Sequence, residues 1–275
     1  MLFGHMHEDA EIERAAFRNK GRMFCIASAG CTAAQLSVTH DVVACDINPV
    51  QLAYAERRLH GAAATLGHAE RAMAFARLFM PLVGWRASVV CAFLAFTNVT
   101  EQLWFWRAHM DTRRFRTIFD TLTSRAILRT WYARRLLTTV PERFGTVLRH
   151  RLERGFARHA NAANPYARSL LLGEAIDLGQ SNASRVKFVG GDAASYLESC
   201  PSGSFDAFSL SNILDGAAPS YRERLSDAVR RAASKDAVVV LRSFGEPSPQ
   251  LTTNHAESDR SMLWGLVDVR RADLF

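Results

Sequence analysis

The stretch FCIASAGCTAAQLS, residues 24–37, decides how the chain begins to fold. The apolar run RMFCIAS (22–28) is typical of a buried strand, and TAAQLS (32–37) is typical of the start of a helix. Small residues and a single glycine, Gly30, join the two runs. α/β proteins bind nucleotides and related cofactors at such strand-to-helix corners. A dinucleotide fingerprint would need three glycines here, so the corner favours a ligand without phosphate groups.

Strand and helix patterns alternate on both sides of a long helical interruption. Strand-like runs follow at DVVACD (41–46), RVKFVGGD (185–192), FDAFSLS (205–211), DAVVVLRSF (236–244) and SMLWGLVDV (261–269). Helical patterns cover residues 5–20 and NPVQLAYAERRL (48–59), in which proline takes the first turn. Such alternation predicts a mainly parallel sheet with helices on both faces. The ligand site should then lie beyond the carboxyl ends of the strands, where the strand order reverses.

These patterns divide the chain into three segments. Residues 1–60 hold an N-terminal helix and the first half of the sheet, and residues 181–275 hold the second half. Residues 61–180 have helical apolar spacing without a succession of strands, which predicts a helical, arginine-rich insertion that serves as a substrate subdomain. We therefore expect an α/β fold with a Rossmann-like sheet and a large helical insertion.

The positive charge of the chain is concentrated in one segment. Residues 101–160 contain thirteen arginines, no lysine and five acidic residues, which gives this segment a net charge of +8. The whole chain has a net charge of +7, so the remaining residues together carry −1. A basic patch attracts phospholipid head groups, nucleic acid or an acidic substrate. Arginine stems can equally cover the apolar surface of a solvated helix. The lack of lysine and of a nucleic-acid motif argues against specific nucleic-acid binding.

Four apolar residues next to these arginines, at 103–106 (LWFW), suit either a face that contacts an anionic membrane surface or the core of a helical subdomain; the core is the preferred interpretation.

Localisation and metal content can be judged from short-range patterns. Residues 1–20 are charged throughout and lack the apolar core of a signal peptide, and the run ASVVCAFLAF (87–96) is too short to span a bilayer. The five cysteines have no C-x-x-C spacing and predict reduced thiols. We expect a cytoplasmic protein that could also bind peripherally to the inner face of the membrane. His5 and His7 have no established metal-ligand spacing, so we expect a mobile N-terminal feature and no metal.

Two aspartates stand at predicted strand ends. Asp46 ends the second strand, sixteen residues after Gly30, and could accept both hydroxyls of a ribose. Asp192 ends FVGGD and could accept from an adenine amino group. Together with the one-glycine corner they are typical of an S-adenosylmethionine (AdoMet) site on a methyltransferase-type sheet. Each aspartate could instead cap the helix that follows it.

Several stretches resemble one known family. IASAGCTAAQL, VVACDINPVQLAYAERRL and NPYARSLLLGE are similar to the bacterial S-adenosylmethionine:diacylglycerol 3-amino-3-carboxypropyltransferases of betaine-lipid synthesis and their relatives. MHEDAEIE resembles the family's Trp-Glu-Asp stretch, with Met6–His7 in place of the aromatic residue. FDAFSLSNILDG resembles its strand-four motif and DRSMLWG its late Asp-Arg motif. The chain departs from the family at Ser211–Asn212, where a more acidic, histidine-containing run is expected.

The resemblance implies an enzyme that transfers the 3-amino-3-carboxypropyl group of AdoMet to an acceptor hydroxyl, above all that of diacylglycerol, and releases methylthioadenosine. It implies a lipid or small-molecule acceptor as partner and AdoMet as co-substrate. The implied cofactor-binding residues are Ser28, Ala29, Gly30, Asp46, Asn48, Gln51 and Asp192. The candidate catalytic residues are Ser211, Asn212 and Asp215, with Asp215 as base, and the candidate substrate residues are Glu8, Asp9, Asn164 and Tyr166.

Three other interpretations remain open from the residues. An AdoMet methyltransferase would share the sheet and the cofactor residues but release S-adenosylhomocysteine. The same carboxypropyl transfer could have a small polar acceptor. An inactive sheet could bind nucleic acid through its arginine-rich helices; non-specific binding of this kind would be lost at moderate salt.

Overall fold

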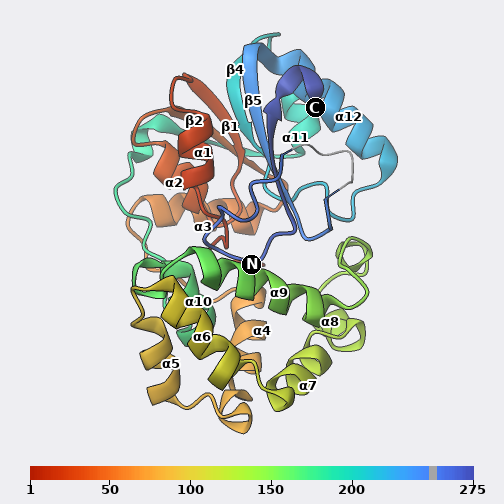
Figure 1. Cartoon of the computed structure of the whole chain (residues 1–275). Helices are drawn as coiled ribbons and strands as arrows, with labels where there is room; N and C mark the ends of the chain where they lie inside the picture. Colours follow the sequence, from red (N-terminus) through yellow and green to blue (C-terminus); the bar gives the residue numbers. More distant parts are fainter. Residues whose placement is uncertain (248–252) are drawn as a thin grey trace.

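The computed structural model describes residues 1–247 and 253–275 of the 275-residue chain. Its centre is a six-stranded sheet with the strand order β3-β2-β1-β4-β5-β6 (Figure 1). The strands are β1 (Arg22–Ile26), β2 (Asp41–Asp46), β3 (Val186–Gly190), β4 (Phe205–Ser209), β5 (Ala233–Ser243) and β6 (Leu266–Arg271). All neighbours pair in parallel except β5 and β6, which are antiparallel. The α/β architecture is confirmed, and it is compatible with a Rossmann-like fold.

The strand order reverses on either side of β1. The chain passes from β1 outward to β2 and β3, and then returns to β4 on the other side of β1. Cys25 of β1 is in register with Ala44 of β2 and with Ser209 of β4, so the carboxyl ends of the three strands meet at one edge. This edge is the switch point at which ligands bind in open α/β sheets.

Helices cover both faces of the sheet because the side chains of each strand alternate between them. In β1, Phe24 packs into the core beneath α11 (Ala193–Ser199) and α12 (Pro219–Ala232). Its neighbours Met23 and Cys25 point to the other face, where the core includes residues of α2 (Cys31–Leu36) and α3 (Pro49–Leu59). The full apolar runs read from the sequence therefore match strands that are buried on both sides.

Helices alone make up the second half of the molecule. Between α3 and β3 the described elements are α4 (His68–Arg77), α5 (Ala87–Leu94), α6 (Val99–Phe105), α7 (Arg113–Leu122), α8 (Arg125–Trp131), α9 (Phe144–Arg158) and α10 (Pro165–Leu172), with short 3-10 and π turns between them. Figure 1 shows this helical half packed against one end of the sheet half. No helix in the described ranges is long and apolar enough to cross a membrane.

Aromatic side chains fill the interior of the helical half. Trp106 is 1% exposed and contacts the rings of Trp85, Phe93, Phe115 and Phe156 at centroid distances of 4.9–5.9 Å. The aromatic run at 103–106 therefore contributes mainly to the core, which was the preferred of its two interpretations. Trp104 is the exception, because 64% of its surface remains exposed.

The arginines of residues 101–160 do not form one solvated face. Arg149 and Arg151 are buried. Arg149 donates hydrogen bonds to the carboxylate of Asp120. Arg151 donates to the backbone carbonyls of Leu263 and Phe244, 2.8 and 2.9 Å away, and so links α9 to the end of the sheet. At least these two arginines of the basic segment therefore stabilise the fold and are not available to bind an anionic partner.

The predicted N-terminal helix at residues 5–20 is wrong in its first half. Only α1 (Glu11–Ala16) is helical, and residues 1–9 form a strap that contains neither helix nor strand. The strap is fixed by side chains from elsewhere: Gln51 accepts from the backbone N–H groups of Leu2 and Phe3, and Glu70 accepts from those of Gly4 and His5. These long-range bonds satisfy the backbone without a helix. The expectation of a mobile His5–His7 segment is corrected by the same bonds.

The last strand is displaced from its predicted position. Residues 261–269 were expected to be extended, whereas β6 spans Leu266–Arg271. Asp259 turns the chain just before it, because its carboxylate accepts from the backbone N–H of Ser261, and Met262 has a positive φ of 64°. The five cysteines, all within the described ranges, are free, as predicted.

Candidate functional site

Two serines with strained backbones stand at the switch point. Ser28 follows β1 with φ 44°, and Ser211 follows β4 with φ 51°. Non-glycine residues seldom adopt positive φ, and such strain, about 1–3 kcal/mol per residue, is concentrated at functional sites. Tertiary hydrogen bonds hold both: the Ser28 N–H donates to Asp46 and the Ser211 carbonyl accepts from the N–H of Arg242. The two serines therefore mark the centre of the candidate site.

The corner between β1 and α2 requires a glycine at position 30 because of a close contact with α3. Gly30 has φ 82° and precedes α2. A Cβ atom at this position would lie 3.0 Å from a methyl group of Leu59 and 3.2 Å from Ala55, both on α3. The missing side chain thus lets α3 approach the corner. Ala29 is fully buried beside it.

The predicted ribose acid, Asp46, organises the same corner. Its carboxylate oxygens each accept one backbone N–H, from Ser28 at 3.0 Å and from Asn48 at 2.8 Å. Burial raises the pKa of Asp46, although these two bonds oppose the shift. Each oxygen keeps acceptor capacity, and the residue is only half-buried, so hydroxyl donors of a ligand could still reach it.

Asn48 and Gln51 serve the local structure. Asn48 is the N-cap of α3, and its side-chain oxygen accepts from the N–H groups of Val50 and Gln51. The Gln51 amide accepts from the strap and donates to the carbonyls of Phe3 and Ser28, at 2.8 and 3.0 Å. Its two donors and its oxygen are therefore engaged within the protein, so Gln51 shapes the corner from behind.

Asp192 caps α11. Its carboxylate accepts from the N–H and the hydroxyl of Ser195, 2.8 and 2.9 Å away. Burial raises the pKa of Asp192, but the hydrogen bonds from Ser195 and Tyr221 and the charge of Arg224 outweigh it and lower the pKa overall. The helix-capping interpretation of this strand-end aspartate is therefore the one that the contacts show, and its adenine contact stays a prediction.

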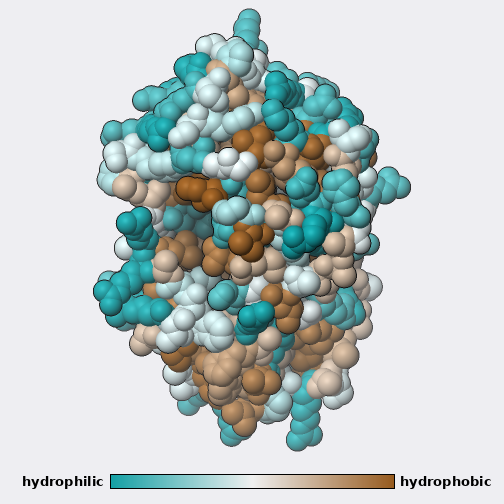
Figure 2. Space-filling model, turned by 180° about the vertical axis from the view of Figure 1, so that it is seen from behind, coloured by the Kyte–Doolittle hydropathy of each residue, from teal (hydrophilic) through white to brown (hydrophobic). Residues whose placement is uncertain are grey.

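A large apolar cavity begins at the two strained serines. It has a volume of about 340 Å³, within the range of ligand sites. Its polar rim at the sheet end includes His7, Glu8, Ser28, Ser211 and Asn212. Its walls come from the helical half and are aromatic and aliphatic, with Trp85, Trp106, Phe115, Leu148 and Phe156 among them. Figure 2 shows apolar residues around a hollow at the level where the two halves of the molecule meet.

Glu8 is the acidic group of this rim. It is 5% exposed, and one carboxylate oxygen accepts from the Ser211 hydroxyl. The other oxygen, Oε2, is buried and has no hydrogen-bond partner among the described residues. Burial raises the pKa of Glu8 to about 7, although Arg242 and the Ser211 hydrogen bond oppose the shift. Glu8 is part of the cavity lining, and a buried carboxylate oxygen without a partner among the described residues is a candidate proton acceptor.

The arginine that stabilises Glu8 lies at the centre of a buried ionic network. Arg242 is fully buried and its guanidinium contacts three carboxylates, those of Glu8, Glu13 and Asp259. Its Nη1 lies 3.8 Å from Glu8 Oε2, beyond hydrogen-bond distance, whereas its Nε is 3.0 Å from Asp259. Glu8 is therefore the least tightly held of the three acids.

Asp215, the predicted base, lies outside the cavity lining. Its two oxygens accept from the Ser243 hydroxyl at 2.6 Å, the Phe244 N–H at 3.0 Å and the Asn212 side chain at 3.2 Å. These bonds tie the turn after β4 to the end of β5. The geometry gives Asp215 a positioning role and leaves Glu8 as the acid that faces the cavity.

Three predicted substrate residues also lie behind the cavity wall. The Asp9 carboxylate is paired with Arg260, whose Nε is 2.6 Å away. Asn164 caps α10 and donates to the Arg260 carbonyl at 2.9 Å. The Tyr166 hydroxyl donates to the Glu8 carbonyl at 2.6 Å. None of the three is part of the cavity lining formed by the described residues, and Tyr166 acts on the site by fixing Glu8.

One group of potential metal ligands lies beside the cavity. His5, His7 and Glu70 bring their ligand atoms within 4.8 Å of one another. Burial lowers the pKa of both histidines, so their neutral forms are favoured. No sequence pattern predicts this group, because Glu70 is far from His5 and His7 along the chain, and nothing in DAVVVLRSF marks Arg242 as a central ion.

The chain was compared with known families and with curated proteins. No family model matches it, and no curated protein does. The resemblance to the aminocarboxypropyltransferases therefore rests on the motifs alone.

Proposed function

We propose that the protein is an AdoMet-dependent transferase of methyltransferase-type fold, which passes the 3-amino-3-carboxypropyl group of AdoMet to the hydroxyl of an apolar acceptor, diacylglycerol or a related lipid. One observation carries the proposal above all. The polar rim at the switch point, with Glu8 and Ser211, opens directly into a cavity whose walls are almost wholly apolar. A hydroxyl on an apolar body would place its polar end at the rim and its chains among the aromatic residues.

AdoMet would occupy the corner after β1. Ser28, Ala29 and Gly30 form the turn, and Asp46 offers acceptor capacity for ribose hydroxyls. Ile47, directly after Asp46, is 73% exposed and offers an apolar surface for the adenine ring. Because Ser28 also lines the cavity, the reacting end of a ligand bound here would face the acceptor.

Glu8 and Ser211 would activate the acceptor. In the reaction, the acceptor oxygen forms a bond with the γ-carbon of the methionine arm, and the bond between that carbon and sulfur breaks. The electron pair goes to sulfur, which becomes neutral in methylthioadenosine. Glu8 Oε2, which has no partner among the described residues, takes the hydroxyl proton. The Ser211 hydroxyl and the Tyr166 bond to the Glu8 backbone orient the carboxyl group.

The helical half would bring the protein to a bilayer. Three apolar residues near its surface, Leu78, Leu82 and Trp104, are 72%, 56% and 64% exposed. Arg113 and Arg114 at the start of α7 are also exposed. Exposed apolar side chains close to arginines suit the interface of an anionic membrane.

Product analysis tests the proposal. Purified protein is incubated with AdoMet and diacylglycerol-containing vesicles, and the nucleoside and lipid products are measured by mass spectrometry. Methylthioadenosine together with a lipid that has gained the carboxypropyl mass is expected. Release of S-adenosylhomocysteine would instead make the protein a methyltransferase, which the same corner could serve. Failure of AdoMet to bind in calorimetry would overturn the proposal altogether.

A further inference from the structure

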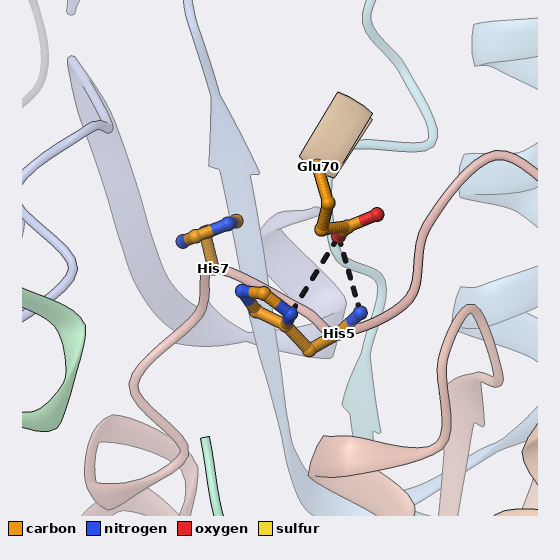
Figure 3. Close-up of side chains that lie close together, drawn as sticks. All are labelled: His5, His7 and Glu70. Carbon is orange, nitrogen blue, oxygen red and sulfur yellow. Dashed lines mark hydrogen bonds and ion pairs between the residues drawn. The ribbon is translucent and has the colours of Figure 1, made fainter. Parts of the chain in front are cut away.

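We propose that His5, His7 and Glu70 form a binding site for a divalent transition-metal ion of the zinc type. One ligand atom of each residue lies within 4.8 Å of the other two. Figure 3 shows the two imidazoles of the strap close together and the carboxylate of Glu70 directed toward them from α4. The His5 Nδ1 is 3.7 Å from Glu70 Oε1, and the two imidazole rings are 4.4 Å apart between centroids.

An unpartnered imidazole points independently to a ligand. Both ring nitrogens of His7 are buried, and neither has a hydrogen-bond partner among the described residues. A buried polar atom without a partner costs free energy, and native proteins rarely leave one. Coordination of a metal ion by one of these nitrogens would supply the missing partner.

The surroundings of the other two ligands orient them for coordination. The His5 Nε2 lies 2.9 Å from the Ser169 hydroxyl, which leaves Nδ1 on the side of Glu70. Glu70 Oε2 accepts from the N–H groups of Gly4 and Gly67, both at 2.8 Å, and its Oε1 accepts from the His5 N–H at 3.2 Å. Hydrogen bonds of this kind fix ligand orientation in metal sites.

The donor set suits zinc. Two imidazoles and one carboxylate are the protein ligands of several zinc sites in which the fourth position is open. His7 belongs to the lining of the apolar cavity, so the fourth ligand would be water or a group that enters from the cavity. The ion would join the N-terminal strap to α4, and thereby the sheet half to the helical half.

Metal binding is measured on the whole chain, without a polyhistidine tag, after dialysis against a chelator. Calorimetric titration with Zn²⁺, and the visible absorption of Co²⁺ as a second probe, should show one equivalent bound with tetrahedral character. His7→Ala and Glu70→Gln should abolish this equivalent. Ser169→Ala, which removes only the partner of His5, should weaken it by about 10–100-fold. His68→Ala, at an exposed position at the start of α4, should bind like the wild type.

Thermal unfolding separates loss of the site from loss of the fold. Zn²⁺ should raise the melting temperature of the wild type and of His68→Ala but not that of a folded His7→Ala. The proposal is overturned if the wild type binds no stoichiometric ion. It is also overturned if His7→Ala, Glu70→Gln and Ser169→Ala all bind as the wild type does.

Discussion

Individual residues at the switch point are suited to the proposed chemistry because their environment changes what their side chains can do. Glu8 is an ordinary acid in the sequence, but burial raises its pKa to about 7 against the opposing effects of Arg242 and Ser211, and Oε2 has no partner among the described residues. Asp215 is equally acidic in the sequence, yet three hydrogen bonds occupy its oxygens. The difference between the two acids is one of environment, not of residue type.

The first prediction concerns Glu8. Glu8→Gln keeps the size and the acceptor oxygen of the side chain but removes its ability to take a proton. We expect kcat for the transfer to fall by about 10²–10⁴-fold, while AdoMet affinity stays close to that of the wild type. The rate of product formation under single-turnover conditions measures the transfer step, and calorimetric titration with AdoMet measures the affinity. Glu11→Gln, on the exposed first turn of α1, is the matched control. Full activity of Glu8→Gln would rule out Glu8 as the base.

Arg242 shows a second residue-scale effect, on stability. Its replacement by methionine leaves Glu8, Glu13 and Asp259 buried without their shared cation. Breaking a buried ion pair in this way costs about 3–5 kcal/mol of unfolding free energy. Urea denaturation followed by circular dichroism should show that loss for Arg242→Met. Arg222→Met, an exposed arginine on α12, should change the stability by less than about 1 kcal/mol.

At the scale of elements, the strap and α4 determine the shape of the site. The strap brings His7 and Glu8 to the cavity, and α4 contributes part of its wall. Gln51 and Glu70 hold the strap through its backbone N–H groups, so the position of Glu8 depends on two helices that precede and follow the 60–67 loop. The polar rim therefore joins the apolar cavity because the strap and α4 pack together, and no single sequence motif produces this arrangement.

The cavity wall on α4 allows a test at this scale. Ala72 lines the cavity, so Ala72→Phe should fill part of it and block a lipid acceptor. We expect the KM for diacylglycerol to rise by about tenfold or more with unchanged AdoMet affinity, since the loss of one well-placed apolar contact is worth about 1–3 kcal/mol. Ala74→Phe, on the same helix but outside the lining, is the control. Equal effects of both substitutions would argue against an acceptor in the cavity.

The whole molecule is a mainly parallel sheet with a helical half packed against one end of it, at the carboxyl ends of the strands (Figure 1). The cavity exists only between the two halves, because its rim comes from the strands and the strap, and its walls come from the helices. Exposed basic residues lie on both halves, but exposed arginines and the exposed apolar side chains of Leu78, Leu82 and Trp104 occur together on the helical half, so under the proposed function a membrane would meet that half first.

Vesicle sedimentation tests this orientation. Substitution of both Arg113 and Arg114 by serine should weaken binding to anionic vesicles by about 30-fold, because each basic residue near such a surface contributes about 1 kcal/mol. The effect should shrink as salt is added. Arg18→Ser with Lys187→Ser removes the same charge from exposed positions of the sheet half and should have little effect. Sedimentation that is unchanged by the α7 substitutions would contradict a membrane contact there.

The sequence by itself determined the alternation of strands and helices, the corner at Gly30 and the helical nature of the long middle segment. These features are local: apolar periodicity, a proline in the first turn of α3 and small residues at a corner act within a few positions of the chain. It misjudged residues 5–10, predicted as helix, because distant partners such as Glu70 fix the strap, and it placed the last strand too early because the Asp259–Ser261 turn lies at its predicted start.

Only the tertiary structure decided which polar residues share the site. The family resemblance names Glu8, Ser28 and Ser211 as site residues, but no spacing along the chain places these three at one rim or joins Glu70 to His5 and His7. Burial then distinguished Glu8 from Asp215 and made a cavity out of residues that the sequence presents as ordinary core. Such properties depend on distance and desolvation, and these are set when the helical half closes over the carboxyl ends of the strands.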